Sequence, residues 1–124
     1  MTDTEPLILI VEDNEFTRKV LSTSLNGINY LFAKNGKEAL SIYNQHKPAL
    51  VFLDLNLPDI LGMELFVEIK NINPNAFIVI MTADNSTETV KNAIQSGVSG
   101  YITKPFARAK LEQYIEKYNE TKNV

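Results

Sequence analysis

Five short apolar segments alternate along the chain with amphipathic ones. Each apolar segment is four or five residues long with little polar interruption, a pattern typical of strands buried on both faces of a parallel sheet. The expected strands are Leu7–Val11, Tyr30–Ala33, Leu50–Leu53, Phe77–Met81 and Val98–Ile102. The fifth is less apolar than the others, so we expect it at an edge of the sheet.

Between and after these strands, apolar residues recur every three or four positions, which predicts amphipathic helices. The expected helices cover Phe16–Leu25, the stretch after the Asn35-Gly36 turn, the stretch from Gly62 to Ile72, the region from Asn85 to Gly97, and a last segment striped by Leu111, Tyr114, Ile115 and Tyr118. Asn85 with Glu88 three residues later resembles a capping box at the start of the fourth helix.

The regular alternation of strand and helix indicates right-handed βαβ units on one parallel sheet. We therefore predict an α/β fold, a three-layer doubly wound sandwich. Its five parallel strands are expected in the flavodoxin-like order 2-1-3-4-5. At 124 residues the chain is expected to form a single domain over residues 1–124, with a core from about residue 7 to residue 118.

Composition narrows the possible functions. The chain has no cysteine, which excludes disulfides and thiolate metal sites. No apolar run approaches the roughly 20 residues that span a bilayer, and the Met1–Pro6 segment is acidic and polar, unlike a signal peptide. A formal net charge of -3 argues against non-specific binding to nucleic acid or membranes. We expect a soluble, cytoplasmic protein that contacts protein partners, with no direct nucleic-acid or membrane contact.

Polar residues follow four of the five expected strands. Glu12 and Asp13 come after the first strand, Asp54 ends the third, Thr82 follows the fourth and Lys104 lies just after the fifth. The carboxyl ends of parallel strands meet at one edge of the sheet, which is where open α/β folds bind ligands. We therefore expect these side chains to converge in one crevice.

Three carboxylates, a hydroxyl and an ammonium in one crevice suit phosphoryl transfer. Two like charges about 4 Å apart cost about 4 kcal/mol at an effective dielectric constant of about 20, so Glu12, Asp13 and Asp54 favour a bound cation. Oxygen ligands with room for water suit Mg²⁺ or Mn²⁺. The metal and Lys104 would neutralise charge on a phosphoryl group, and Thr82 would donate a hydrogen bond to one of its oxygens.

In this order on these strand ends, the residues resemble the motif of response-regulator receiver domains of two-component signalling. The matching fragments are Glu12-Asp13, Asp54 with Leu57-Pro58 and Gly62, Thr82-Ala83, and Lys104-Pro105. The resemblance runs from about Leu7 to Tyr118 and is specific because all the fragments occur together. It implies a signalling phosphoacceptor rather than an enzyme. Such a domain takes its phosphoryl group from a histidine kinase or phosphotransfer protein and catalyses only its own phosphorylation and dephosphorylation.

The resemblance implies a role for each residue of the acidic cluster. Asp54 would accept the phosphoryl group. Asp13 would bind Mg²⁺ directly, and Glu12 would act largely through a metal-bound water. The backbone carbonyl of Asn56 would complete the protein's share of the metal ligands.

The remaining roles concern the phosphorylated state. Thr82 and Lys104 would contact the phosphoryl group, and Tyr101 would be an aromatic switch that turns inward. Asn56 and Asp84 would flank the path of the attacking water and so tune hydrolysis. The resemblance also favours a cis bond between Lys104 and the following proline, with Phe106 at the start of the last helix. The surface of the fourth helix, fifth strand and last helix would then admit a downstream protein partner.

Three other functions fit part of the pattern. A haloacid-dehalogenase-like phosphatase also uses aspartyl phosphate, Mg²⁺, Thr and Lys, but carries an Asp-x-Asp motif on its first strand. A flavodoxin-like electron carrier needs hydroxyl and glycine residues after the first strand, where Glu12 and Asp13 would repel a phosphate. An inactive receiver used only for docking is disfavoured because every site residue is present. His46, the only histidine, lies near a helix C-terminus and is interpreted as structural.

Overall fold

Strand and helix alternate throughout the part of the chain that the computed structural model describes, residues 6–84, 86–105 and 107–122. The elements are β1 (Ile8–Val11), α1 (Glu15–Ser24), β2 (Tyr30–Ala33), α2 (Gly36–His46), β3 (Leu50–Asp54), α3 (Gly62–Ile72), β4 (Phe77–Thr82), α4 (Thr87–Gln95), β5 (Gly100–Thr103) and α5 (Arg108–Lys122). None of these helices is long and apolar enough to cross a membrane.

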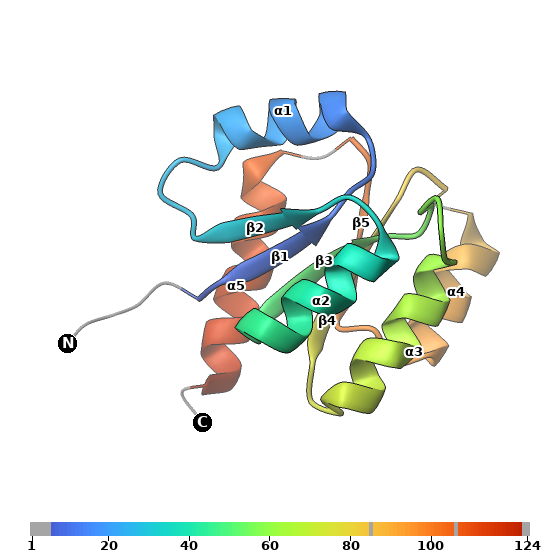
Figure 1. The fold of residues 1–124 in the computed structure, drawn as a ribbon. Helices are drawn as coiled ribbons and strands as arrows, with labels where there is room; N and C mark the ends of the chain where they lie inside the picture. The colour runs from blue at the N-terminus through green and yellow to red at the C-terminus, as the bar shows by residue number, and fades with distance from the viewer. Residues whose placement is uncertain (1–5, 85, 106, 123–124) are drawn as a thin grey trace.

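The strands form one sheet in the order β2-β1-β3-β4-β5, and every neighbouring pair is parallel. The predicted fold class and strand order are therefore confirmed, as is the edge position of β5. β3 lies at the centre, with β1 on one side and β4 on the other (Figure 1). This arrangement places the carboxyl ends of β1, β3, β4 and β5 along one edge.

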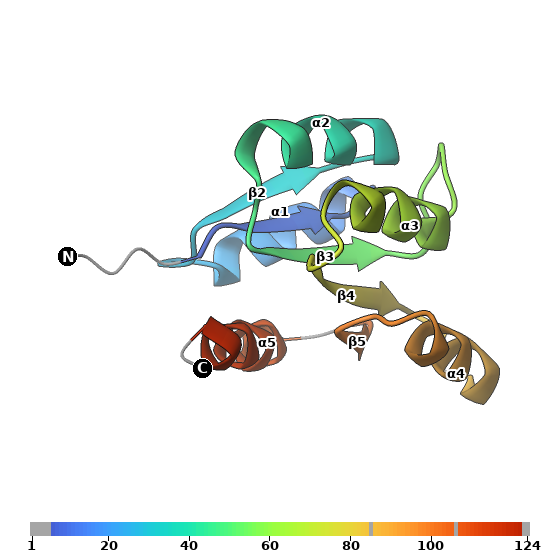
Figure 2. The same ribbon diagram turned by 90° about the horizontal axis from the view of Figure 1, so that it is seen from below.

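Successive strand residues point to opposite faces, and both faces are covered. Val51 and Leu53 belong to the core layer that packs against α2 and α3, whereas Leu50 and Phe52 belong to the layer that packs against α1 and α5. In Figure 1, α2 crosses in front of the sheet and α5 lies behind it; the turned view in Figure 2 again separates α2 and α3 from α5. All five residues of β3 are buried, which explains the uninterrupted apolar run of residues 50–53 before Asp54.

The chain turns back tightly after β3. The N–H of Gly62 donates to the carbonyl of Leu55 across 3.1 Å. A Cβ atom at Gly62 would lie 2.5 Å from the Cα of Leu55 and 2.8 Å from the carbonyl oxygen of Asp54. Both neighbours are backbone atoms and cannot move aside cheaply, so a side chain at this position would push the β3–α3 loop away from the strand end.

The first turn of α4 differs in detail from the sequence prediction. The expected capping residue, Asn85, lies outside the described residues. Ser86 is the N-cap of α4, and its hydroxyl accepts the N–H of Thr89 across 3.3 Å. Because serine and asparagine both cap well, an Asn-Ser pair does not determine from sequence alone which residue caps the helix.

The last two elements also have different bounds. β5 begins at Gly100, so Val98 precedes the strand. α5 extends to Lys122, beyond the predicted stripe, because its exposed second half is rich in Glu and Lys, which favour helix without an apolar face. The Lys104–Pro105 bond is cis, as predicted. Phe106, expected at the start of the last helix, lies outside the described residues.

Candidate functional site

Three charged side chains from three strand ends meet at the carboxyl edge of the sheet. The Nζ atom of Lys104 is 2.8 Å from Oδ2 of Asp54 and 2.7 Å from Oε1 of Glu12. The Glu12 and Asp54 side chains are only 1% and 3% exposed, whereas that of Lys104 is 22% exposed. The lysine thus bridges two buried carboxylates whose strands, β1 and β3, are neighbours.

Both carboxylate oxygens of Asp54 have partners. Oδ2 accepts the hydrogen bond from Lys104, and Oδ1 accepts the N–H of Asn56 across 2.9 Å. The second bond forms because the chain bends immediately after β3, which turns the Asn56 amide back toward the strand end. The carboxylate is therefore held in one orientation at the end of the central strand.

Glu12 is less completely satisfied. Its Oε2 atom accepts the N–H of Asn14 across 3.2 Å. Its Oε1 atom has the ionic contact with Lys104, but no donor is aligned for a hydrogen bond to it among the described residues. Burial raises the pKa of Glu12, and the contact with Lys104 only partly opposes that rise.

The raised pKa has a consequence for stability. The folded state holds the Glu12 proton more tightly than the unfolded state, so ionising Glu12 costs stability. That cost is absent below the ordinary value of 4.5 and is fully present above the folded pKa. A cation placed beside Oε1 would offset it.

A metal ion fits this arrangement. Glu12, Asp13 and Asp54 each offer a carboxylate oxygen, and these three oxygens lie within 4.8 Å of one another. Asp13 is exposed and the other two are buried, so the cluster combines two fixed anchors with an opening to solvent. An all-oxygen donor set that leaves room for water suits a small hard divalent cation.

Lys104 is held in its charged form. Burial alone would lower its pKa, but the hydrogen bond to Asp54 and the ionic contact with Glu12 outweigh burial and hold the pKa above 10.5. The resulting stabilisation is fully present below pH 10.5 and is lost as the pH rises through the folded pKa. The backbone N–H of Lys104 also donates to the carbonyl of Thr82 across 2.8 Å, which links the end of β5 to the end of β4.

Thr82 lies at the same edge, but its hydroxyl is bonded toward α4. Oγ1 of Thr82 accepts the N–H of Asp84 across 3.0 Å. The Asp84 carboxylate accepts the N–H of Ser86 at 2.9 Å and the hydroxyl of Thr89 at 2.8 Å. These bonds lower the pKa of Asp84, the backbone bond from Ser86 most of all. A continuous chain of hydrogen bonds thus joins Thr82 to the first turn of α4.

Tyr101 points away from the site. Its side chain is 38% exposed and borders a surface hollow with Val90 and Ile94 of α4. Its backbone carbonyl accepts the hydroxyl of Tyr114 from α5 across 3.1 Å. The structure therefore has Tyr101 in an outward position between α4 and α5.

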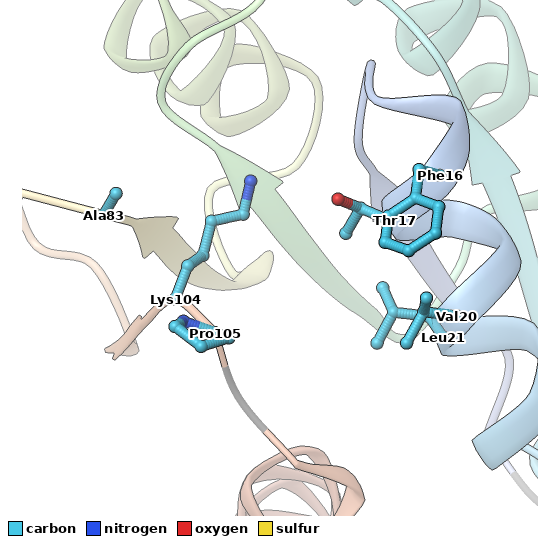
Figure 3. A pocket seen from close by; sticks show the side chains of 7 residues that line it. All are labelled: Phe16, Thr17, Val20, Leu21, Ala83, Lys104 and Pro105. Atoms are coloured by element: carbon cyan, nitrogen blue, oxygen red, sulfur yellow. The ribbon is translucent and has the colours of Figure 1, made fainter.

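An apolar hollow of about 370 Å³ adjoins the charged cluster. Figure 3 shows Phe16 and Val20 of α1 across the hollow from Ala83 and Pro105, with the Lys104 amine extending toward the end of β3. Phe16 is 74% exposed and Val20 51% exposed. Helical spacing puts Phe16 and Val20 on one apolar face with Leu21 and Leu25 and so predicts that all four are buried; this is wrong for Phe16 and Val20, since only the two leucines are buried.

Two supporting residues escaped the sequence reasoning. Arg18 donates from Nη1 to the carbonyl of Glu12 across 2.8 Å and so braces the end of β1. Asp59 accepts the backbone N–H groups of Gly36 and Lys37. Arg18, six residues from Glu12, could have been suspected as a brace at the start of α1. Nothing in the local sequence connects Asp59 with residues more than twenty positions earlier.

Comparison with known proteins agrees with this geometry. Residues 8–116 match the model of the response regulator receiver domain. This chain belongs to that family. The sequence of this receiver domain is 37% identical over 110 residues to that of the chemotaxis protein CheY of Halobacterium salinarum, with 87% of this chain and 92% of that protein covered.

Two further relatives support the same assignment. The receiver domain is 35% identical over 119 residues to CheY of Bacillus subtilis, with 94% of this chain and 97% of that protein covered. The crystal structure of a CheY-like receiver domain protein from Methanospirillum hungatei matches it with a TM-score of 0.85 at 27% identity, covering 97% and 98% of the two chains. The function is that of a signalling phosphoacceptor in a two-component system. The haloacid-dehalogenase alternative has no support.

Proposed function

We propose that this receiver domain takes a phosphoryl group onto Asp54 from a phosphohistidine of a histidine kinase or phosphotransfer protein. A carboxylate oxygen attacks the phosphorus, the P–N bond breaks, and its electron pair stays on the imidazole nitrogen. Asp54 becomes an acyl phosphate. The observation that carries the proposal is the fixed, buried carboxylate of Asp54, with an ammonium 2.8 Å from one oxygen and the Asn56 N–H 2.9 Å from the other.

The cation that the cluster would hold is Mg²⁺ or Mn²⁺. Its ligands would be Asp13 and Asp54, Glu12 acting largely through water, and the backbone carbonyl of Asn56. When bound, the metal supplies positive charge for the phosphoryl oxygens. The buried Oε1 atom of Glu12, which lacks an aligned donor, supports this assignment.

The protein partner would approach over the hollow beside Lys104. A phosphohistidine must come within bonding distance of Asp54, and the apolar hollow lies immediately next to the lysine that contacts it. Phe16 and Val20 are large, apolar and exposed there, so an apolar side chain of the donor protein could be buried against them. The charged cluster would then be covered during transfer.

The domain would promote only reactions at its own aspartate. In dephosphorylation, a water oxygen attacks the phosphorus, the bond between phosphorus and the Asp54 oxygen breaks, and the products are the carboxylate and inorganic phosphate. Asn56 and Asp84 would tune this step by orienting the water. Asp84 is bonded to Ser86 and Thr89 in this structure, so its contribution depends on loosening those bonds.

The output surface would comprise α4, β5 and α5. Phosphorylation would draw the Thr82 hydroxyl toward the phosphoryl oxygens, away from the N–H of Asp84, and so weaken the bonds that hold the start of α4. Tyr101 would turn inward into the released space. A downstream protein that prefers the new surface would shift the population toward it, with a coupling of about 1–3 kcal/mol.

Intact-mass spectrometry with acetyl phosphate tests the proposal. The parent should gain one phosphoryl group with Mg²⁺ or Mn²⁺ present and none in a chelator. Asp54→Asn should gain none. Glu68→Gln is the control, because it removes an exposed carboxylate of α3 outside the site, and it should be labelled like the parent. Undiminished labelling of Asp54→Asn would place the acceptor elsewhere.

A further inference from the structure

The loop between β3 and α3 is attached to a distant helix by one carboxylate. Oδ1 of Asp59 accepts the N–H of Gly36 across 2.8 Å, and Oδ2 accepts the N–H of Lys37 across 3.0 Å. Both donors belong to the first turn of α2, twenty-three and twenty-two residues earlier in the chain. Asp59 is therefore a two-point bridge between the loop and α2.

The carboxylate satisfies N–H groups at the start of the helix, which have no acceptor within the helix. Asn35 supplies the ordinary cap, and its side chain accepts the N–H of Glu38 across 2.8 Å. The two amides before Glu38 are left to Asp59. A negative charge at this end of the helix also interacts favourably with the helix dipole. The hydrogen bond from Gly36, and to a smaller extent that from Lys37, lowers the pKa of Asp59.

An apolar contact accompanies the polar one. A Cβ atom at Gly36 would overlap the side chain of Ile60. The absence of a side chain at Gly36 therefore lets the loop lie directly against the helix. Ile60 itself packs against the core layer on the α2 and α3 side of the sheet. The tip of the loop is thus seated by two adjacent residues of different chemistry.

The other end of the same loop reaches the phosphoacceptor site. The Asn56 N–H bonds to Asp54, and Asn56 forms a β-bridge with Leu61 that closes the loop. Asp59 lies between the two bridged residues. The position of Asn56 therefore depends on where the loop tip is held, and the polar part of that attachment is Asp59.

We propose that Asp59 is a positioning residue of the metal site: by anchoring the loop tip to α2, it fixes the Asn56 carbonyl in place beside Asp54. The inference rests on the proposed function, because it assigns that carbonyl to the metal. Asp59 does not touch the cation and acts only through the backbone of the loop. Its carboxylate serves two ends at once, capping α2 and holding the loop.

The test compares three variants: Asp59→Ala, Asp59→Asn and Asn35→Ala. Mg²⁺ affinity is measured by calorimetric titration without any phosphodonor, and stability by urea unfolding in a chelator. Asn35→Ala removes another cap of the same helix turn, so it is the matched control for helix stability. Asp59→Asn keeps one acceptor oxygen and loses the second.

We expect Asp59→Ala to weaken Mg²⁺ binding about tenfold, the lower end of the loss that follows removal of a residue supporting metal ligands. The Mg²⁺ affinity of Asp59→Asn should lie between that of the alanine variant and that of the parent. Asn35→Ala should lower the urea midpoint but leave the Mg²⁺ dissociation constant within about twofold of the parent, since a cap can be lost without moving the loop.

The possible contrary results are distinct. Equal Mg²⁺ affinity in the parent and both Asp59 variants, or an equal loss in Asn35→Ala and Asp59→Ala, would show that Asp59 only caps the helix. If Asp59→Ala does not fold, parent-like Mg²⁺ affinity in Asp59→Asn would also overturn the inference. A parent that binds no Mg²⁺ would instead overturn the proposed function, and this inference with it.

Discussion

Replacing Lys104 by methionine would remove the ammonium and keep most of the side-chain volume. The change leaves Glu12 and Asp54 buried side by side without the lysine Nζ atom, which lies 2.7 Å from the Glu12 oxygen and 2.8 Å from the Asp54 oxygen. Removing one partner of a buried ion pair costs about 3–5 kcal/mol. The Lys104 side chain is 22% exposed, so solvent screens part of the effect, and we expect a loss of about 2–3 kcal/mol.

Magnesium should reverse part of this loss. If Mg²⁺ binds at the carboxylates as proposed, it would supply the positive charge that the variant lacks, and in the parent it would compete with Lys104 for Glu12 and Asp54. Mg²⁺ should therefore raise the stability of Lys104→Met more than that of the parent. Urea unfolding followed by circular dichroism, in a chelator and in saturating Mg²⁺, measures both quantities.

The control is Lys110→Met, which removes an exposed lysine of α5 outside the site. It should change stability by no more than about 0.5 kcal/mol in either condition. If Lys104→Met were as stable as the parent in chelator, the two buried carboxylates would not need the lysine. If Lys104→Met lost as much unfolding free energy relative to the parent in Mg²⁺ as in chelator, the metal and the lysine would not act on the same charges.

Three further predictions concern the metal, the phosphoryl lifetime and the output. Asp13→Ala should stabilise the metal-free protein, because it removes one negative charge from the acidic cluster, and it should abolish Mg²⁺ binding. The gain should be at most about 1 kcal/mol, since Asp13 is exposed and solvent screens its repulsion. A melting temperature below that of the metal-free parent would contradict repulsion within the cluster. Replacing Asn56 and Asp84 together by leucine should slow loss of the phosphoryl group, followed by intact mass, and faster loss would remove them from the hydrolysis path. Amide exchange with beryllofluoride, a phosphoryl mimic, should change in residues 86–103; a change confined to residues around Glu12 and Asp54 would refute the proposed route to the surface.

The sequence was sufficient to predict the fold because its signals agree. Each buried strand is a short apolar run, and each is separated from the next by a helix. Parallel strands then bring their carboxyl ends together whatever the sequence distance. Strand order therefore places Glu12, Asp54 and Lys104 at one edge, and the long side chain of Lys104 spans the end of β4 to reach the two carboxylates.

Contacts that depend on loop shape could not be predicted in this way. The bridge from Asp59 to α2 joins residues more than twenty positions apart, and no periodicity connects a loop with the start of a distant helix. The direction of the Thr82 hydroxyl depends on the turn after β4, which the hydrophobic pattern does not describe. The exposure of Phe16 and Val20 was also missed, because helical spacing does not reveal how far a neighbouring element covers a helix face.

The central claim is that Asp54 carries the phosphoryl group, and chemical localisation tests it most directly. Borohydride reduces an aspartyl phosphate to homoserine, which tandem mass spectrometry can place in the sequence. After treatment with acetyl phosphate and Mg²⁺, homoserine should appear at position 54, and it should be absent after treatment in a chelator. Homoserine at position 13 or 84 instead, or phosphorylated protein with unmodified Asp54, would contradict the account.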